Sequence, residues 1–148
     1  MNERLIRKIT SITGRRASEC SCEECRNQCR TPCLGTPDDI LRLIEAGYAD
    51  KLAFTHWAVG MMLGKLPLPI PMVQILKTEN GCVFFKNGLC ELHNLGLKPT
   101  EGRLSHHEIK LENYIFGLSL TWNVAKQWIE EENFGKIIRV FVLKELLK

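Results

Sequence analysis

The sequence predicts a mainly α-helical single domain, a helical bundle that carries a small β-hairpin and a cysteine-rich loop. Three observations lead to this prediction. The 148 residues are 45% hydrophobic and 25% charged, which is the composition of one ordinary globular domain. Apolar residues recur at helical spacing in several segments. Seven cysteines, five of them within fourteen residues, are too concentrated to be explained by a hydrophobic core.

The first segment is expected to form an amphipathic helix that ends near Gly14, with Leu5, Ile6, Ile9 and Ile12 at helical spacing. Residues 1–16 also hold most of the excess positive charge of the chain. They include one acidic residue, Glu3, and five basic residues: Arg4, Arg7, Lys8, Arg15 and Arg16. The remainder is close to neutral, and the segment has no aromatic residue on which a base could stack. A nucleic-acid partner is therefore not expected.

Residues 17–35 show no hydrophobic periodicity and are expected to form a loop. A helix should follow, because Thr36 can cap it and Pro37 suits its first position. Two acidic residues in its first turn, Asp38 and Asp39, complement the positive end of the helix dipole. Its buried residues should be Ile40, Leu41 and Ile44, and Gly47 should end it.

A second helix is expected from about Asp50 to Leu63, with Leu52, Trp57 and Met61 on one side. Trp57, Met61 and Met62 are assigned to the core. Three prolines then force an extended connection, and residues 70–76 could form an edge strand, where proline is tolerated.

Two short runs, residues 82–85 and 89–93, flank an Asn-Gly dipeptide that is typical of hairpin turns. A two-residue loop would send Cys82 and Cys90 to opposite faces of the hairpin. A three-residue loop, which opposes Phe84 to Cys90, places both sulfur atoms on one face. We therefore expect the longer loop.

The C-terminal part, residues 105–148, is expected to consist of helices. Ser105 and Glu108 have the spacing of a capping box and predict a long helix from His106 to about Glu131. Its apolar positions include Ile115, Leu118, Trp122 and Ile129. The last segment is rich in β-branched residues but ends in helix formers, so a helix is expected, with a strand as the alternative.

Six cysteines have a spacing that suits metal ligands: Cys22, Cys25, Cys29, Cys33, Cys82 and Cys90. A two-residue separation lets two thiolates reach one ion, and sulfur ligands select zinc, copper(I) or iron–sulfur clusters. Six thiolates suit two zinc tetrahedra that share two bridging sulfurs, and one ion with two spare thiols is equally allowed. Cys20 is left as a spare thiol.

The cysteines also bear on the cellular compartment. The amino terminus lacks the apolar stretch of a secretory signal, and an odd number of cysteines does not suit a disulfide framework. No apolar run approaches the length needed to cross a bilayer. A cytoplasmic protein with reduced thiols and without a membrane partner is expected.

Three stretches resemble the YkgJ-like cysteine-cluster family, described as having a zinc- or iron-chelating domain. They are the CEECRNQC run from Cys22 to Cys29, the segment TPDDILRLIEAG and the segment CVFFKNGLCELH. The resemblance covers about residues 20–107. It implies a metal-chelating domain whose ligands lie in the first and third of these stretches.

The sequence departs from that family pattern at two places. Arg30 stands where the second cysteine of an adjacent pair would be, so Cys33 is expected to substitute for it. Lys98 and Pro99 resemble the Arg-Pro segment of the pattern, and Gly102 occupies the approximate place of its last cysteine. The candidates for the missing ligand are His93, His106 and His107.

The expected function is that of a metal-binding module with a structural or interaction role, whose partner is an unknown protein or small molecule. Zinc is the expected metal, and iron or an iron–sulfur cluster is the alternative. An iron or iron–sulfur enzyme of unknown substrate is the competing hypothesis, although no phosphate loop, dinucleotide fingerprint, HExxH or GxSxG motif accompanies the cysteines. Thiol redox chemistry at Cys22 and Cys25 is disfavoured, because Glu23 and Glu24 would raise their pKa values.

Overall fold

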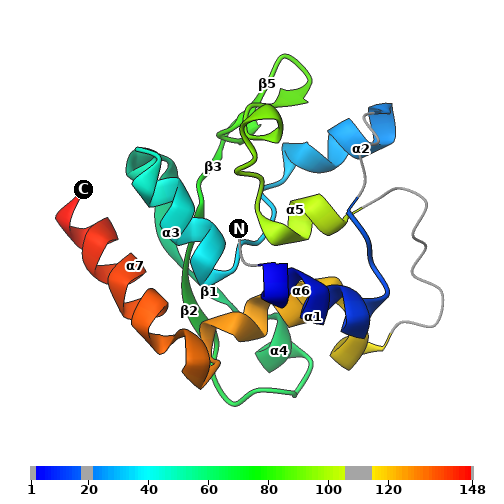
Figure 1. Cartoon of the computed structure of the whole chain (residues 1–148), viewed down its shortest axis with the longest axis vertical. Coiled ribbons are helices and arrows are strands. Elements are labelled where there is room, and N and C mark those ends of the chain that lie inside the picture. The colour runs from blue at the N-terminus through cyan, green and yellow to red at the C-terminus, as the bar shows by residue number, and fades with distance from the viewer. Residues whose placement is uncertain (1–2, 18–21, 106–114, 148) are drawn as a thin grey trace.

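The structure, a computed structural model, describes residues 3–17, 22–105 and 115–147. These residues are mainly helical, with three small antiparallel strand pairs (Figure 1). The prediction of a mainly α-helical chain with a small hairpin is therefore confirmed. The helices do not by themselves show a bundle, because the β1–β2 ribbon runs between them (Figure 1). None of the helices in the described ranges is both long and apolar enough to cross a bilayer.

The first helix, α1 (Glu3–Thr13), confirms the predicted amphipathic segment. Its buried residues are Leu5 and Ile9, which lie one turn apart. The helix ends at Gly14, whose φ of 72° is one that glycine adopts without strain. With residues of α5 (Thr100–Leu104) and α6 (Leu120–Ala125), α1 forms the smaller of two cores: Leu5, Ile9, Leu104, Leu120 and Val124.

Part of the predicted loop is helical. The structure has α2 (Glu23–Asn27) followed by a 3-10 turn, η1 (Gln28–Arg30). Neither element buries a residue, which is why no hydrophobic periodicity marks them. Their sequence signal is electrostatic, because Glu23 and Glu24 lie in the first turn of α2 and Arg26 lies in its last turn.

The third helix, α3 (Pro37–Glu45), forms as predicted and buries Ile40, Leu41 and Ile44. Thr36 and Asp39 make a reciprocal capping box, in which the Thr36 N–H donates to Asp39 Oδ2 over 2.9 Å. The same oxygen accepts a 2.8 Å bond from the Thr100 N–H and a 2.6 Å bond from the Thr100 hydroxyl. Asp39 therefore joins the start of α3 to the start of α5.

The expected helix over residues 50–63 is wrong for most of its length. The structure has a 3-10 turn, η2 (Ala49–Lys51), then the strand β1 (Leu52–Trp57) and only a short helix, α4 (Val59–Met62). The expected strand over residues 70–76 is confirmed as β2 (Ile70–Ile75), and it pairs with β1 along its whole length. Pairing with this β-branched partner overrides the weak helical spacing of β1.

The core assignments in this region are confirmed only in part. Leu52 and Trp57 are buried at the two ends of β1. Met61 and Met62 are 41% and 80% exposed, so their assignment to the core is wrong. The reason is that α4 ends before it can present a second turn to the core.

Four short strands follow: β3 (Lys77–Thr78), β4 (Gly81–Cys82), β5 (Phe85–Lys86) and β6 (Leu89–Cys90). The hairpin is confirmed, but the three-residue loop is wrong, because Phe85 and not Phe84 lies opposite Cys90. Asn87 and Gly88 both have positive φ, 54° and 77°, as a tight two-residue hairpin turn requires. Cys82 pairs with Lys77 in a different ribbon, so hairpin register does not decide where its sulfur lies.

A 3-10 turn, η3 (His93–Leu95), and the helix α5 follow the hairpins. Ser105 lies at the C-terminal cap of α5. Its proposed capping partner Glu108 falls outside the described residues, as does the segment 106–114 of the predicted long helix.

The described remainder of the predicted long helix is broken into η4 (Phe116–Leu118), α6, η5 (Lys126–Trp128) and η6 (Glu131–Asn133). Ser119 starts α6 by accepting a hydrogen bond from the Trp122 N–H. Three of the expected apolar positions are exposed: Ile115, Leu118 and Ile129. The long single helix is therefore wrong over this range.

The final helix, α7 (Phe134–Leu146), confirms the helix expected for the last segment. It lies beside α3 (Figure 1), and both helices contribute to the larger core. The most deeply buried members of that core are Ile40, Leu43, Met72, Val73, Phe84, Leu92, Ala125 and Val140. The buried Lys144 donates a 2.8 Å hydrogen bond to the carbonyl of Ala49, which connects α7 to η2, the turn before β1.

Replacing Asp39 with alanine is expected to lower the free energy of unfolding by about 3 kcal/mol, because three buried donors lose their acceptor. Asp38 is the matched control, since it is the neighbouring acid of the same helix turn and makes a partly exposed 3.0 Å ion pair with Lys136. Asp38→Ala should cost less than about 1 kcal/mol. Urea unfolding followed by circular dichroism measures both, and equal losses would contradict the role of Asp39.

Candidate metal centre

Four of the six predicted ligands come from four separate segments. Cys29 lies in η1, Cys33 lies shortly before α3, Cys82 ends β4, and Cys90 ends β6. The α2–η1 segment and the short hairpins lie in the upper part of Figure 1, with α5 below them. Electrostatic interactions among the four thiols show that their side chains are neighbours.

Packing between η1 and the hairpins positions Cys29. The guanidinium of Arg30 lies 5.4 Å from the centre of the Phe85 ring, which is within the range of a cation–π contact. On the other side, β4 approaches closely: a Cβ atom at Gly81 would come within 2.5 Å of the Arg30 carbonyl oxygen. Gly81 also has a φ of 98°, so both the contact and the backbone favour glycine there.

The segment after Cys33 is held by side chains from three other elements. The Leu34 N–H donates a 2.9 Å bond to Glu101 Oε1, and the other Glu101 oxygen accepts a 2.7 Å bond from the Thr121 hydroxyl. Glu101 therefore links the cysteine segment to both α5 and α6. A backbone bond from the Glu101 N–H to the Leu34 carbonyl, 3.2 Å long, completes the connection.

Gly35 is fixed just as firmly, by the buried side chain of Gln74 on β2. The Gly35 N–H donates to Gln74 Oε1 over 2.8 Å, and Gln74 Nε2 donates back to the Gly35 carbonyl over 3.0 Å. The indole N–H of Trp128 donates a 2.8 Å bond to the same carbonyl. The backbone two residues after Cys33 thus has a set position before any ligand is bound.

Helix α5 approaches the Cys33 thiol closely. A Cβ atom at Gly102 would lie 2.7 Å from Cys33 Sγ and 3.0 Å from Lys98 Cε. A side chain at this position would displace the thiol, so the contact requires glycine. Gly102, Lys98 and Cys33 form one packed group at the cysteine cluster.

Cys29 is the acidic member of the cluster. Hydrogen bonding from the Cys90 side chain is the largest influence, and it lowers the pKa of the Cys29 thiol to about 6. Burial opposes this shift, while Lys98, through its charge and a hydrogen bond, and the charge of His93 support it. At neutral pH the metal-free cluster therefore holds one thiolate, at Cys29.

The other three thiols are held in the neutral form. Donation to Cys29, together with burial, raises the pKa of Cys90. Burial raises the pKa of Cys33, the charge of Glu101 raises it further, and Lys98 opposes the shift. Burial is also the main cause of the raised pKa of Cys82.

Backbone N–H groups point at two of the sulfur atoms. Cys82 accepts hydrogen bonds from the N–H groups of Phe84 and Phe85, and Cys90 accepts one from that of Leu92. These bonds favour the ionised form. They therefore oppose the rise in the pKa values of both thiols, although burial and, for Cys90, the hydrogen bond to Cys29 outweigh them. They supply hydrogen bonds of the kind that orient metal-bound thiolates.

The remaining predicted ligands lie elsewhere or outside the described residues. Cys22 is the exposed residue that precedes α2, and Cys25 lies within α2, partly buried. His93 begins η3, close enough for its charge to act on Cys29. Cys20, His106 and His107 fall outside the part of the chain that the structure describes. In that part, no three histidine, cysteine, aspartate or glutamate side chains already stand in the arrangement of a metal site.

The sequence alone did not reveal the side chains that position the backbone near Cys33 or that act on the thiols. Glu101 and Gln74 act on the backbone of residues 34 and 35 over long sequence separations, and no local pattern reveals such pairs. Lys98 was noted only through a resemblance, although the run Lys98-Pro99-Thr100 is a helix start that the residues alone could have indicated.

In metal-free protein, Cys29 is expected to be the clustered thiol that iodoacetamide modifies fastest at pH 7, because the other three stay protonated. Its lowered pKa means that the thiolate persists until the pH falls through about 6. Cys90→Ala should slow the reaction at pH 6.5 about tenfold, since it removes the main cause of the shift.

Peptide mapping by mass spectrometry gives the rate at each cysteine. Lys86→Gln is the matched control, because Lys86 lies in the same hairpin but makes an exposed 3.4 Å ion pair with Glu91. It should leave the Cys29 rate unchanged. A rate at Cys29 that already declines below pH 8.5 would contradict the assigned thiolate.

Comparisons of the chain with models of protein families, with curated proteins and with solved structures return no match. The resemblance to YkgJ-like cysteine-cluster proteins therefore stays a prediction from sequence motifs. The case for function rests on the geometry and chemistry of the described residues.

Proposed function

We propose that this protein is a metal-binding protein in which Cys29, Cys33, Cys82 and Cys90 hold a soft cation, with zinc as the expected ion. The observation that carries the proposal is the meeting of four thiols from two distant parts of the chain, two of which accept backbone N–H bonds. Four thiolates are a complete ligand set for a structural zinc site.

The proposal is supported by the presence of four sulfur ligands in one place. Within the described residues, these ligands are not yet arranged as a finished coordination sphere. The four thiols are neighbours, and a cation that bound them would draw their side chains closer. A zinc ion with four thiolates has a net charge of about −2. Lys98, whose charge and hydrogen bond already act on Cys29, would offset part of that charge.

The directions of the four pKa shifts indicate how many protons the thiols would release when a metal binds. Metal binding replaces the protons of ligating thiols. Cys29 has already lost its proton at neutral pH, whereas Cys33, Cys82 and Cys90 must each release one. Metal affinity should therefore fall as the pH is lowered.

Cys22 and Cys25 are the remaining pair of the six-cysteine set. Four ligands suffice for one ion, and all six would allow two ions that share bridging sulfurs. They lie on and just before α2, which leads directly into η1 and Cys29. A measurement of the number of bound ions will show whether Cys22 and Cys25 are ligands.

The proposed role is structural or in interaction with a protein or small-molecule partner, in the cytoplasm. Bound metal would cross-link the cysteine segment to the hairpins and stabilise both. The described cysteines are free thiols, in keeping with a reducing compartment. An iron or iron–sulfur enzyme would use the same four thiols, so the identity of the metal separates the two functions.

Protein purified without oxygen is expected to contain one or two zinc ions per chain by elemental analysis and to be colourless. Serine at position 29, 33, 82 or 90 should remove at least one ion per chain, because each variant deletes a ligand of the proposed site. Cys22→Ser and Cys25→Ser serve as comparison variants: they should leave a one-ion protein fully loaded and reduce a two-ion protein.

The same samples test the structural role. A chelator should lower the melting temperature of the wild type and change that of Cys90→Ser little. A brown protein with iron and sulfide would support the enzyme hypothesis instead. Wild-type protein without any bound transition metal would contradict the proposed function.

A further inference from the structure

Helix α7 carries a row of apolar side chains that face away from the core. Its members follow one another at every fourth residue and are 51%, 63%, 51% and 74% exposed: Phe134, Ile138, Val142 and Leu146. Residues four apart lie on the same side of a helix, so these four form one continuous ridge, which we call the α7 ridge. In Figure 1, α7 lies at the edge of the molecule, with α3 and the β1–β2 ribbon on its inner side.

The apolar surface continues from the α7 ridge onto β1. Phe54, which is 43% exposed, stacks on Phe141 of α7 with the ring centres 5.7 Å apart. The four ridge side chains and Phe54 expose roughly 100 Å² each. With the stems of the exposed Arg139 and Glu145, the surface reaches roughly 600 Å². Pairing two such surfaces would remove roughly 1,200 Å² from water, which is the lower end of the range for stable protein interfaces.

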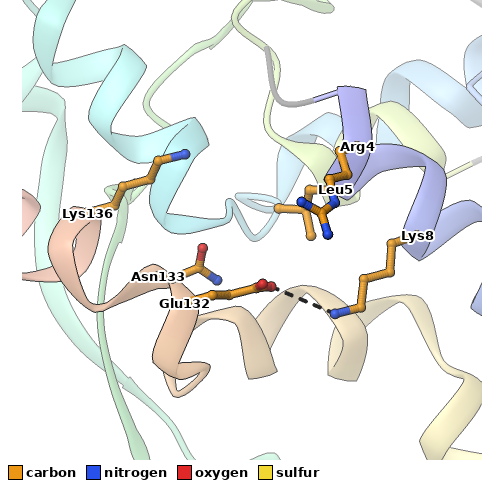
Figure 2. Close-up of a pocket in the computed structure, with 6 residues that line it drawn as sticks. All are labelled: Arg4, Leu5, Lys8, Glu132, Asn133 and Lys136. Atoms are coloured by element: carbon orange, nitrogen blue, oxygen red, sulfur yellow. Dashed lines mark ion pairs between the residues drawn. The ribbon is translucent and has the colours of Figure 1, made fainter.

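The charged side chains beside the ridge are neutralised within one chain. Three ion pairs, at 3.0, 3.5 and 3.8 Å, do this: Lys136–Asp38, Arg139–Glu45 and Lys8–Glu132, the last of which is drawn in Figure 2. A nucleic acid or an anionic lipid surface would be attracted by unpaired cations, whereas these cations already face carboxylates. The surface is therefore suited to a partner that is itself apolar and close to neutral.

Gly135 is a second sign that another molecule approaches this face. It is exposed, its φ is not positive, and a Cβ atom there would meet no described atom within 4 Å. By contrast, a Cβ atom at Gly102 would lie 2.7 Å from Cys33 Sγ, so the fold itself requires that glycine. Glycine weakens a helix relative to alanine, and the described residues of the chain give no reason for it at position 135. The missing side chain leaves a hollow beside the ridge that a neighbouring helix could fill.

We propose that the α7 ridge pairs with the same ridge of a second copy of this chain, in an antiparallel arrangement. The ridge has the same spacing when read from either end, so it can be its own complement about a two-fold axis. An axis between Ile138 and Val142 places each of them against the other residue of the second copy. The same axis brings Leu146, the most exposed ridge residue, over the hollow at Gly135 of the second copy. Antiparallel pairing also keeps the two Glu145 side chains at opposite ends of the interface.

Sedimentation velocity of the full chain tests the proposal, with a phosphine reductant present to exclude dimers that are linked by disulfides. The wild type should change from mainly monomer at about 2 µM to mainly dimer at about 200 µM, because a small interface is expected to give a dissociation constant of about 20 µM. A wild-type protein that stays monomeric at about 200 µM would overturn the proposal.

A pair of matched variants locates the interface. Ile138→Glu should weaken the dimer more than about tenfold, because it buries a carboxylate without a partner at the centre of the interface. Met62→Glu is the control, since Met62 is an exposed apolar residue of α4 outside the ridge, and it should weaken the dimer less than about twofold. Equal weakening by the two variants would overturn the assigned surface, because unspecific apolar association gives that result.

Gly135→Leu tests the packing without disturbing the single chain. The new side chain has free space in the monomer and favours the helix, so the melting temperature of dilute protein should not fall. The dimer should weaken about tenfold, because the hollow for Leu146 is filled. Unchanged dimerisation of this variant would overturn the antiparallel arrangement. Co-sedimentation of the wild type, but not of Ile138→Glu, with phosphatidylglycerol vesicles would assign the ridge to a lipid surface and overturn the dimer.

Discussion

The buried carboxylate of Asp39 is the interaction on which the cysteine end of the molecule depends. One of its oxygens accepts three hydrogen bonds, one within the cap of α3 and two from Thr100 at the start of α5. The carboxylate thereby fixes the distance between the helix that follows Cys33 and the helix that carries Gly102. The close contact between Gly102 and the Cys33 thiol exists only while these two helix starts stay together.

Around that fixed point, the protein holds its thiols in different protonation states. Cys29, beside Lys98 and the Cys90 thiol, has a lowered pKa. Burial keeps Cys33 and Cys82 neutral, and the hydrogen bond to Cys29, together with burial, keeps Cys90 neutral. A partly buried cluster of four thiolates would be strongly disfavoured without a cation, and the neutral thiols avoid this cost in the metal-free state. The backbone around Cys33, held by Glu101, Gln74 and Trp128, makes the arrangement independent of the metal.

The sequence predicted those elements whose signals are local. The cap at Thr36, the amphipathic spacing of α1 and the Asn-Gly turn each specify a short piece of backbone, and all three form as expected. The prediction was wrong where a segment distant in the sequence determines the local structure. Residues of β1 were predicted to be helical, but they form a strand because they pair with β2. The cysteine spacing singled out the thiols as candidate ligands. The predicted hairpin register was wrong, because Cys82 and Cys90 belong to separate ribbons joined by a turn.

X-ray absorption at the zinc edge of protein purified without oxygen tests the central claim most directly, because it reports the atoms bound to the metal. The account predicts a shell of four sulfur atoms at about 2.3 Å. Simultaneous replacement of Cys82 and Cys90 by serine should remove sulfur from that shell. A wild-type shell made mainly of nitrogen or oxygen atoms at about 2.0–2.1 Å would contradict a site built from these thiols.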